Sequence, residues 1–402
     1  MKNESVAILD IRSNEISFLL GAKGVNGMFV ISGMFVISGI HVERYEGFCL
    51  DGFFDEEAFR RAVVRAVSAV QQNYRGTIDK IYVGVPSAFV SVVTKGQTIA
   101  FESKRKLSSQ DVDTLFDHGL DELALSGRCV RRSAMYFTLG DNRKHFDVDD
   151  LYGMHSTTLK GGLCYYFVSE YFYEIIQGLM ESMAFFDVKY IPSTLAQSIY
   201  LLPEKKREGF AFLLDIGFVT SSLSVVYGNG IVHEENFNCG IASVLVELIK
   251  TLGVEFNVAE EMLASANISG GSETEYVTYS TAGEECTIPT NRINDAIKCA
   301  VDQLCERLDA SLQKYYREKN SATMSVNPIS VTGEGICGIK GIVEHIEKRI
   351  GWVTETVYPD LPFYDKPTAS SKISLLNMAL NDQMKNTGIW QRLLKRLGGK
   401  KS

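Results

Sequence analysis

The sequence has 402 residues, of which 45% are hydrophobic and 22% are charged, with a formal net charge of −8. This length allows two or more domains with a large core, and the acidic balance argues against general nucleic-acid binding. No uncharged stretch reaches transmembrane length, and acids within the first ten residues lead us to expect no secretory signal.

Two segments about half a chain apart share one outline. They read "AILDIRSNEISFLLGAKGVNGMFVI" from Ala7 and "FLLDIGFVTSSLSVVYGNGIVHEE" from Phe212. In each, an apolar strand ends in Leu-Asp-Ile, and a polar turn, a second strand, a glycine turn and a third strand follow. An amphipathic helix is predicted after each segment, over 55–75 and 240–253. The repetition predicts an α/β fold with two related lobes and a ligand cleft between them.

A perfect tandem repeat, "GMFVISGMFVIS", spans 27–38 in the first of these segments. Six residues is an even number, so a strand would keep its inner and outer faces through both copies. We expect the repeat to lengthen a strand or its turn, and we attach no chemistry to it.

Later strands and helices alternate, with two interruptions. Residues 85–165 predict a strand, a helix and two more strands, which we interpret as a small inserted subdomain. A second insertion is predicted over 240–290. The remaining segments form the cores of the two lobes: 1–84 with 166–206 for the first, and 207–239 with 291–364 for the second.

The C-terminal end has a different composition from the rest. Residues 365–386 are mixed and polar at their start, and we predict a linker there. Over 387–402 the sequence predicts an amphipathic helix with a basic face, too short to cross a bilayer. From Gln383 onward the chain has six bases and no acid, so the rest of the protein carries −14.

This pattern is typical of a helix that lies on an anionic membrane surface. An alternative is a last helix that folds back onto the domain. The residues predicted to contact the membrane are Ile389, Trp390, Arg392, Leu393, Leu394, Lys395, Arg396 and Leu397.

The order of these features resembles FtsA, the actin-like family of bacterial cell division. In the actin and Hsp70 superfamily, two turns after Asp-ending strands hold nucleotide phosphates, and a later glycine turn holds the adenosine. The matching stretches are "LDIRSNEISFLLG", "LLDIGFVTSSLSV" and "ISVTGEGICGIKGI". The inserted subdomain resembles the strand-helix-strand-strand insertion of the family, and the basic tail resembles its membrane-targeting sequence.

The resemblance implies a site for ATP and Mg²⁺ between the lobes. Its cofactor-binding residues would be Asp10, Ser13, Asn14, Asp215, Gly217, Thr220, Ser221, Gly240, Glu260, Gly333, Glu334 and Gly335. The three turns depart from the family pattern, since Arg12, Glu15 and Phe218 stand where small or basic residues are usual. These departures predict weak ATP binding and weak or no hydrolysis, and no catalytic residue is predicted. Eight scattered cysteines without a C-x-x-C pair predict no metal site of protein ligands alone.

By resemblance, the protein is a scaffold at the division site, on the cytoplasmic face of the bacterial inner membrane. It would self-associate into actin-like polymers, bind anionic lipids, recruit other division proteins and capture the C-terminal peptide of FtsZ on the insertion 240–290. An actin-like pilus-assembly protein is one alternative, and a sugar kinase or Hsp70-type ATPase is another. No distinct motif for a kinase base is present.

Overall fold

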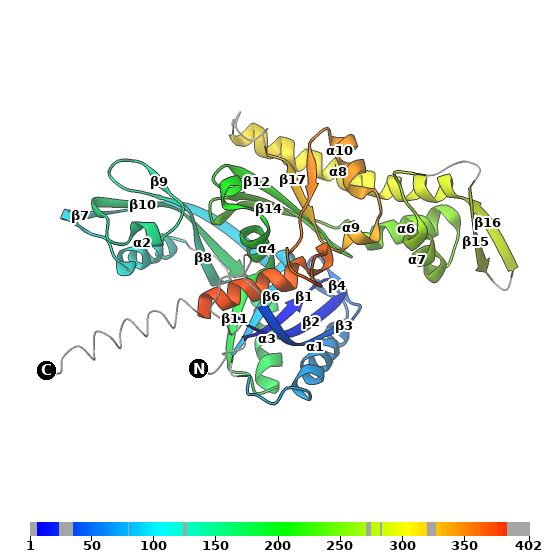
Figure 1. Cartoon of the computed structure of the whole chain (residues 1–402), viewed down its shortest axis with the longest axis horizontal. Coiled ribbons are helices and arrows are strands. Elements are labelled where there is room, and N and C mark those ends of the chain that lie inside the picture. The colour runs from blue at the N-terminus through cyan, green and yellow to red at the C-terminus, as the bar shows by residue number, and fades with distance from the viewer. Residues whose placement is uncertain are drawn as a thin grey trace.

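The computed structural model describes residues 6–23, 35–78, 80–123, 127–270, 275–281, 284–319 and 327–383. Three larger sheets and the helices that cover them form two lobes and two projections at opposite ends of the molecule (Figure 1). This architecture confirms the predicted two-lobed α/β fold with an inserted subdomain. The first copy of the tandem repeat and the tail 387–402 lie outside the described residues.

The first lobe is built on a five-stranded mixed sheet in the order β11-β6-β1-β2-β3. Parallel pairs join β11, β6 and β1, whereas β1, β2 and β3 form the predicted antiparallel meander. Helices α1 and α3 bury one apolar side against the sheet, as their spacing of hydrophobic residues predicts. Its elements are β1 (Val6–Ile11), β2 (Glu15–Lys23), β3 (Phe35–Arg44), β4 (Phe48–Cys49), β5 (Gly52–Phe53), α1 (Glu56–Gln71), β6 (Lys80–Val85), α3 (Glu170–Ser182), β11 (Asp187–Pro192), α4 (Ser193–Leu201) and α5 (Glu204–Arg207).

The predicted insertion 85–165 forms its own antiparallel sheet, in the order β7-β10-β8-β9, with one helix packed on it. It projects at the left of Figure 1. The sequence order of its long elements is strand, helix, strand, strand. Its elements are β7 (Val90–Lys106), α2 (Ser109–Asp121), β8 (Arg128–Thr138), β9 (Lys144–His145) and β10 (His155–Val168).

The second lobe repeats the plan of the first. Its sheet has the order β14-β13-β12-β17-β18, with an antiparallel meander followed by parallel pairs. The elements are β12 (Phe210–Ile216), β13 (Ser221–Tyr227), β14 (Gly230–Phe237), α8 (Thr290–Lys319), β17 (Ile329–Thr332), α9 (Glu334–Gly338), α10 (Ile342–Ile350) and β18 (Thr354–Thr356). The longest of these is α8, with 30 residues.

The segment 240–290 contains two helices and a hairpin that projects at the right of Figure 1. Both helices bury apolar residues in the core of the second lobe, so this segment is partly a layer of that lobe. Its elements are α6 (Ile241–Leu252), α7 (Phe256–Ser265), β15 (Tyr276–Thr281) and β16 (Glu284–Pro289).

The structure contradicts the linker predicted over 365–386. Residues 370–383 are helical, and all of 370–376 are buried. The side chains of Leu375 and Leu376 pack against Gly84 and Gly21 of the first sheet. The serines that suggested a polar tether instead fill a buried interface, where Ser370 Oγ accepts a hydrogen bond from Thr332 Oγ1 at 2.7 Å.

One apolar cluster joins the two lobes, the inserted subdomain and the helix 370–383. It contains Ile8 of β1, Tyr166 of β10, Leu213 of β12 and Leu376 of the helix 370–383. Arg131 of β8 also forms a two-pronged ion pair with Asp382 at the far end of that helix. The helix, drawn in red across the front of Figure 1, therefore touches both lobes and the inserted subdomain. No described helix is long and apolar enough to cross a membrane.

Candidate functional site between the lobes

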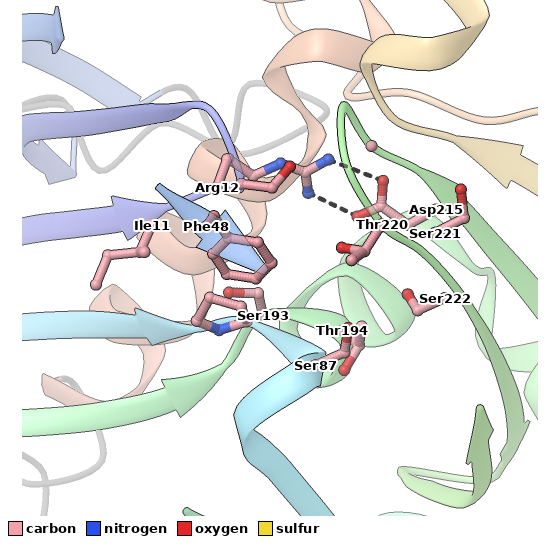
Figure 2. A pocket seen from close by; sticks show the side chains of 13 residues that line it. Ile11, Arg12, Phe48, Ser87, Ser193, Thr194, Asp215, Thr220, Ser221 and Ser222 are labelled. Atoms are coloured by element: carbon pink, nitrogen blue, oxygen red, sulfur yellow. Dashed lines mark hydrogen bonds and ion pairs between the residues drawn. The ribbon is translucent and has the colours of Figure 1, made fainter. Parts of the chain in front are cut away.

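The strands β1 and β12 occupy equivalent positions in the two sheets, and each ends in the predicted Leu-Asp-Ile. Asp10 lies beside Gly84 of the parallel strand β6, and Asp215 lies beside Thr332 of the parallel strand β17. The turns that follow face each other across a small pocket (Figure 2). The pocket is lined by Ile11, Arg12, Ser13, Phe48, Pro86, Ser87, Ser193, Thr194, Asp215, Gly217, Thr220, Ser221 and Ser222.

Arg12 from the first turn reaches across this pocket to Asp215, as Figure 2 shows. Its guanidinium donates to both carboxylate oxygens, at 2.6 Å to Oδ2 and 3.0 Å to Oδ1. The Gln197 amide adds a third bond to Oδ2 at 3.0 Å. Burial alone would raise the pKa of Asp215, but Arg12 and Gln197 lower it overall. The charged pair is therefore the stable form of this contact at neutral pH.

The two phosphate-type turns also bond to each other directly. The backbone N–H of Val219 donates to Ser13 Oγ at 3.1 Å. The carbonyls of Gly217 and Phe218 accept from the first backbone N–H groups of α6 at 3.2 and 2.8 Å. These backbone N–H groups, which could otherwise donate to a phosphate, therefore already have partners within the protein.

The third turn closes the site from the second lobe. Gly333 has φ +99, and a Cβ there would lie 2.3 Å from Asp215 Oδ1, so only glycine suits the position. The next residue, Glu334, accepts a long hydrogen bond from Asn14 at 3.5 Å. Burial raises the pKa of Glu334.

Asp10 lies behind the pocket and is completely buried. Ser371 Oγ of the C-terminal helix donates to Asp10 Oδ1 at 2.6 Å, whereas Oδ2 has no hydrogen-bond partner. Burial raises the pKa of Asp10, although Arg12 and Lys372 partly offset this. Lys372 itself bonds to Glu15 at 3.3 Å and to Ser17 at 3.2 Å. The helix 370–383 thus provides the polar environment of the first turn.

In this closed arrangement the pocket is too small for ATP. The cavity is about 40 Å³, whereas pockets for small-molecule ligands measure roughly 300–1,000 Å³. Arg12 is the single base among the lining residues, and its guanidinium is bound to Asp215. Nucleotide could enter this cleft only after the ion pair separates.

The structure brings part of the predicted site together. Ser13, Asp215, Gly217, Thr220 and Ser221 line the pocket. The remaining predicted residues are not among its lining, namely Asp10, Asn14, Gly240, Glu260, Gly333, Glu334 and Gly335.

Gly240 and Glu260 lie away from the pocket for different reasons. Gly240 precedes α6, where a Cβ would meet the carbonyl of Phe218 at 2.4 Å, so its role is close packing of the second turn. Glu260 is exposed on α7, while the neighbouring Leu263 belongs to the core of the second lobe. No contact of Glu260 supports the ribose role that the resemblance implies.

Sequence reasoning missed α4, which begins directly after β11 and supplies Ser193, Thr194 and Gln197 to the site. Its sequence, "STLAQSIYL", follows "YIP". The cluster of small hydroxyls at the start of a helix was the available signal, because such residues after a buried strand commonly begin a helix.

Comparison of the sequence with family models and with curated proteins gives no match. Solved structures do match across nearly the whole chain. The PilM–PilN type IV pilus biogenesis complex aligns with a TM-score of 0.59 and 10% identity over 94% of this chain and 99% of the other. MreB5 of Spiroplasma citri bound to AMPPNP aligns with a TM-score of 0.56 and 11% identity, over 96% and 99%.

A third match is MamK in a double helical filament, with a TM-score of 0.50 and 12% identity over 93% of this chain and 98% of the other. Actin-like proteins of this kind thus include members solved with nucleotide, as a filament and in a complex with another protein. A sequence identity near 10% shows that the fold is shared and nothing more. The resemblance to FtsA in particular therefore stays a prediction. The chain has the actin-like ATPase fold.

Proposed function

We propose that this protein is an actin-like scaffold whose two lobes are held together by its own side chains, and that it organises a protein assembly on a membrane. The observation that carries the proposal is the Arg12–Asp215 ion pair, which joins the two turns that the resemblance assigns to nucleotide phosphates. A buried pair of this kind costs several kcal/mol when one partner is removed. It therefore favours the closed cleft.

Apolar packing supports the same closed arrangement. The cluster that contains Ile8, Leu213 and Leu376 runs through both lobes and the C-terminal helix. Nucleotide-driven opening would have to separate part of this core, whereas a scaffold benefits from a fixed shape. We infer that the cleft acts as a structural joint, and that ATP binds weakly or not at all.

Membrane attachment through the tail 387–402 is the second part of the proposal. The six bases after Gln383 contrast with the net charge of −14 on the rest of the chain. Each base near an anionic leaflet contributes about 1 kcal/mol, and Trp390 and the leucines add burial in the headgroup region. With the resemblance to FtsA, this supports a scaffold on the cytoplasmic face of the inner membrane, where its copies would associate with one another.

Two cellular machines suit such a scaffold. The resemblance to FtsA favours division, with the FtsZ C-terminal peptide and other division proteins as partners. Similarity to the PilM–PilN complex favours pilus biogenesis, with a PilN-type segment as partner. The basic amphipathic tail supports the division scaffold, which we place first.

The test uses the full chain on anionic vesicles. Electron microscopy and co-sedimentation, each with and without ATP and Mg²⁺, should show vesicle-bound assemblies in both conditions. Binding of the protein to immobilised FtsZ C-terminal peptide and to immobilised PilN is then compared. Capture by the FtsZ peptide alone supports the division scaffold, and capture by PilN alone supports the pilus assembly. Assemblies that form only with ATP would contradict the closed joint.

A further inference from the structure

A layer of polar side chains lies between α4 and the sheet of the second lobe. Ser224 of β13 is paired across the strands with Glu234 of β14, and Ser222 is paired with Asn236. Residues two apart on a strand face the same side, so these four side chains share one face of the sheet. Ser224 Oγ donates to Glu234 Oε1 at 3.2 Å. Interiors usually place apolar groups between a helix and a sheet, and this layer departs from that rule.

The layer has an excess of oxygen atoms with no hydrogen-bond partner. The amide nitrogens are already used, because Gln197 donates to Asp215 at 3.0 Å and Asn236 donates to the Ser87 carbonyl at 3.3 Å. Their oxygens are left shielded and unpaired. On α4 and β14 the oxygens without a partner are Ser193 Oγ, Gln197 Oε1, Ser198 Oγ and Asn236 Oδ1, and the Thr194 hydroxyl interacts with the Glu234 carboxyl. Thr194, Gln197 and Ser198 are each at least 97% buried, and buried polar side chains usually have a partner.

The chemical nature of these unpaired oxygens indicates whether a ligand would be a cation or an anion. The hydroxyls of this set could donate to an anion, but the Glu234 carboxylate and the two amide oxygens can only accept hydrogen bonds and therefore favour a cation. Such oxygens are the ligands of hard cations. Mg²⁺ and Ca²⁺ sites in proteins generally use more than one carboxylate or retain several waters. We propose that the layer between α4, β13 and β14 binds one alkali cation, K⁺ or Na⁺, with Glu234 as its charged ligand.

Access and room are both consistent with a small ion. The interlobe pocket is lined by Ser87, Ser193, Thr194 and Ser222, so the layer opens onto it. Its volume of about 40 Å³ holds roughly three water-sized centres, since each needs about 10–15 Å³. An ion with a few waters can therefore enter where a nucleotide cannot.

The position gives the ion a structural effect. Helix α4 follows β11 of the first lobe, whereas β13 and β14 belong to the second, so a shared cation ties the lobes together beside the Arg12–Asp215 pair. Binding to the folded protein alone raises its stability by mass action. The inference is independent of which cellular machine the scaffold serves.

Thermal unfolding of the full chain in choline, sodium and potassium chloride at one ionic strength tests the proposal. One of the two alkali ions should raise Tm above the choline value by about 2–4 °C, in a saturable way. Glu234→Gln should lose this increase. The matched control is Glu235→Gln, because Glu235 lies on the opposite face of β14 and bonds to Ser311. The control should keep the full increase.

Two results would overturn the proposal. One is a wild-type Tm that is the same in choline, sodium and potassium chloride. That result would mean that water, and not an alkali ion, contacts these oxygens. The other is an alkali-dependent increase that persists in Glu234→Gln. A response to Mg²⁺ alone would overturn the choice of an alkali ion. If Glu234→Gln fails to fold, the near-isosteric Thr194→Val takes its place, and anomalous scattering from rubidium in crystals should place the ion beside Glu234.

Discussion

Arg12 is the residue that most changes the interpretation of the cleft. In the sequence it stands where the family pattern usually has a small or basic residue. In the structure its guanidinium is bound to Asp215 through two hydrogen bonds, at 2.6 and 3.0 Å. The planar guanidinium can donate two hydrogen bonds to a carboxylate as well as to a phosphate. Arg12 can therefore hold the cleft closed by binding Asp215, in place of binding a phosphate.

Arg12→Ala and Asp215→Ala should each lower the free energy of unfolding by about 3–5 kcal/mol, because each leaves a buried charge unpaired. The double variant should lose less than the sum of the two, which denaturant unfolding measures as a coupling energy. Arg61→Ala is the control, since Arg61 is exposed on α1. Additive losses would mean that the pair does not hold the cleft.

Asp10→Asn gives a prediction about pH. Burial raises the pKa of Asp10, so the wild-type carboxyl stabilises the folded state least once pH has risen through that raised pKa. The amide of the variant cannot ionise, and its oxygen can still accept the hydrogen bond from Ser371. The variant should therefore gain about 1 kcal/mol of stability relative to wild type at neutral pH, and the gain should shrink towards pH 4. A loss of stability at every pH would show that the carboxylate is required.

The C-terminal helix shows which elements the sequence could predict. The meanders after the two Leu-Asp-Ile strands, the inserted subdomain and α8 were predictable, because their apolar periodicity repeats over many residues. The helix 370–383 was not, because its buried face contains Ser370, Ser371 and Ser374 as well as leucines. Those serines suit a helix only when partners such as Asp10 and Thr332 from other elements meet them, and such partners are not visible in a local pattern.

Leu376→Ala should lower the free energy of unfolding by about 2–5 kcal/mol, because it removes a fully buried side chain from the cluster that joins the lobes. Asn381→Ala, at an exposed position of the same helix, should change it by less than about 0.5 kcal/mol. If both substitutions have equally small effects, the linker predicted from the sequence would be supported instead of the packed helix.

For the candidate site, the sequence brought together some of the residues that line the pocket, whereas their role in binding a cofactor stays a prediction. Asp215, Thr220 and Ser221 face the pocket as predicted. The pairing of Arg12 with Asp215, 203 positions away, depends on how the two lobes approach each other. The polar face of α4 depends on the same approach. Both are tertiary features that the pattern of one sequence does not contain.

The whole molecule combines a rigid two-lobed body with a tail of opposite charge. Trp390→Glu removes an aromatic anchor and adds a repelled charge, so it should release the full chain from anionic vesicles in co-sedimentation. Arg392→Glu combined with Lys395→Glu should have the same effect, and added salt should weaken wild-type binding to anionic vesicles through screening. Tm of the body should stay the same. A lower Tm with unchanged vesicle binding would mean that the last helix folds back onto the domain.

Calorimetric titration of the full chain with ATP and Mg²⁺ tests the closed joint most directly. We expect no saturable heat and no increase in Tm for the wild type, because the Arg12–Asp215 pair and the apolar core keep the cavity at about 40 Å³. Binding at a hundredfold excess over Kd would instead add about 2.7 kcal/mol to stability. A saturable heat with a matching rise in Tm would contradict the closed joint and make nucleotide the partner of this cleft.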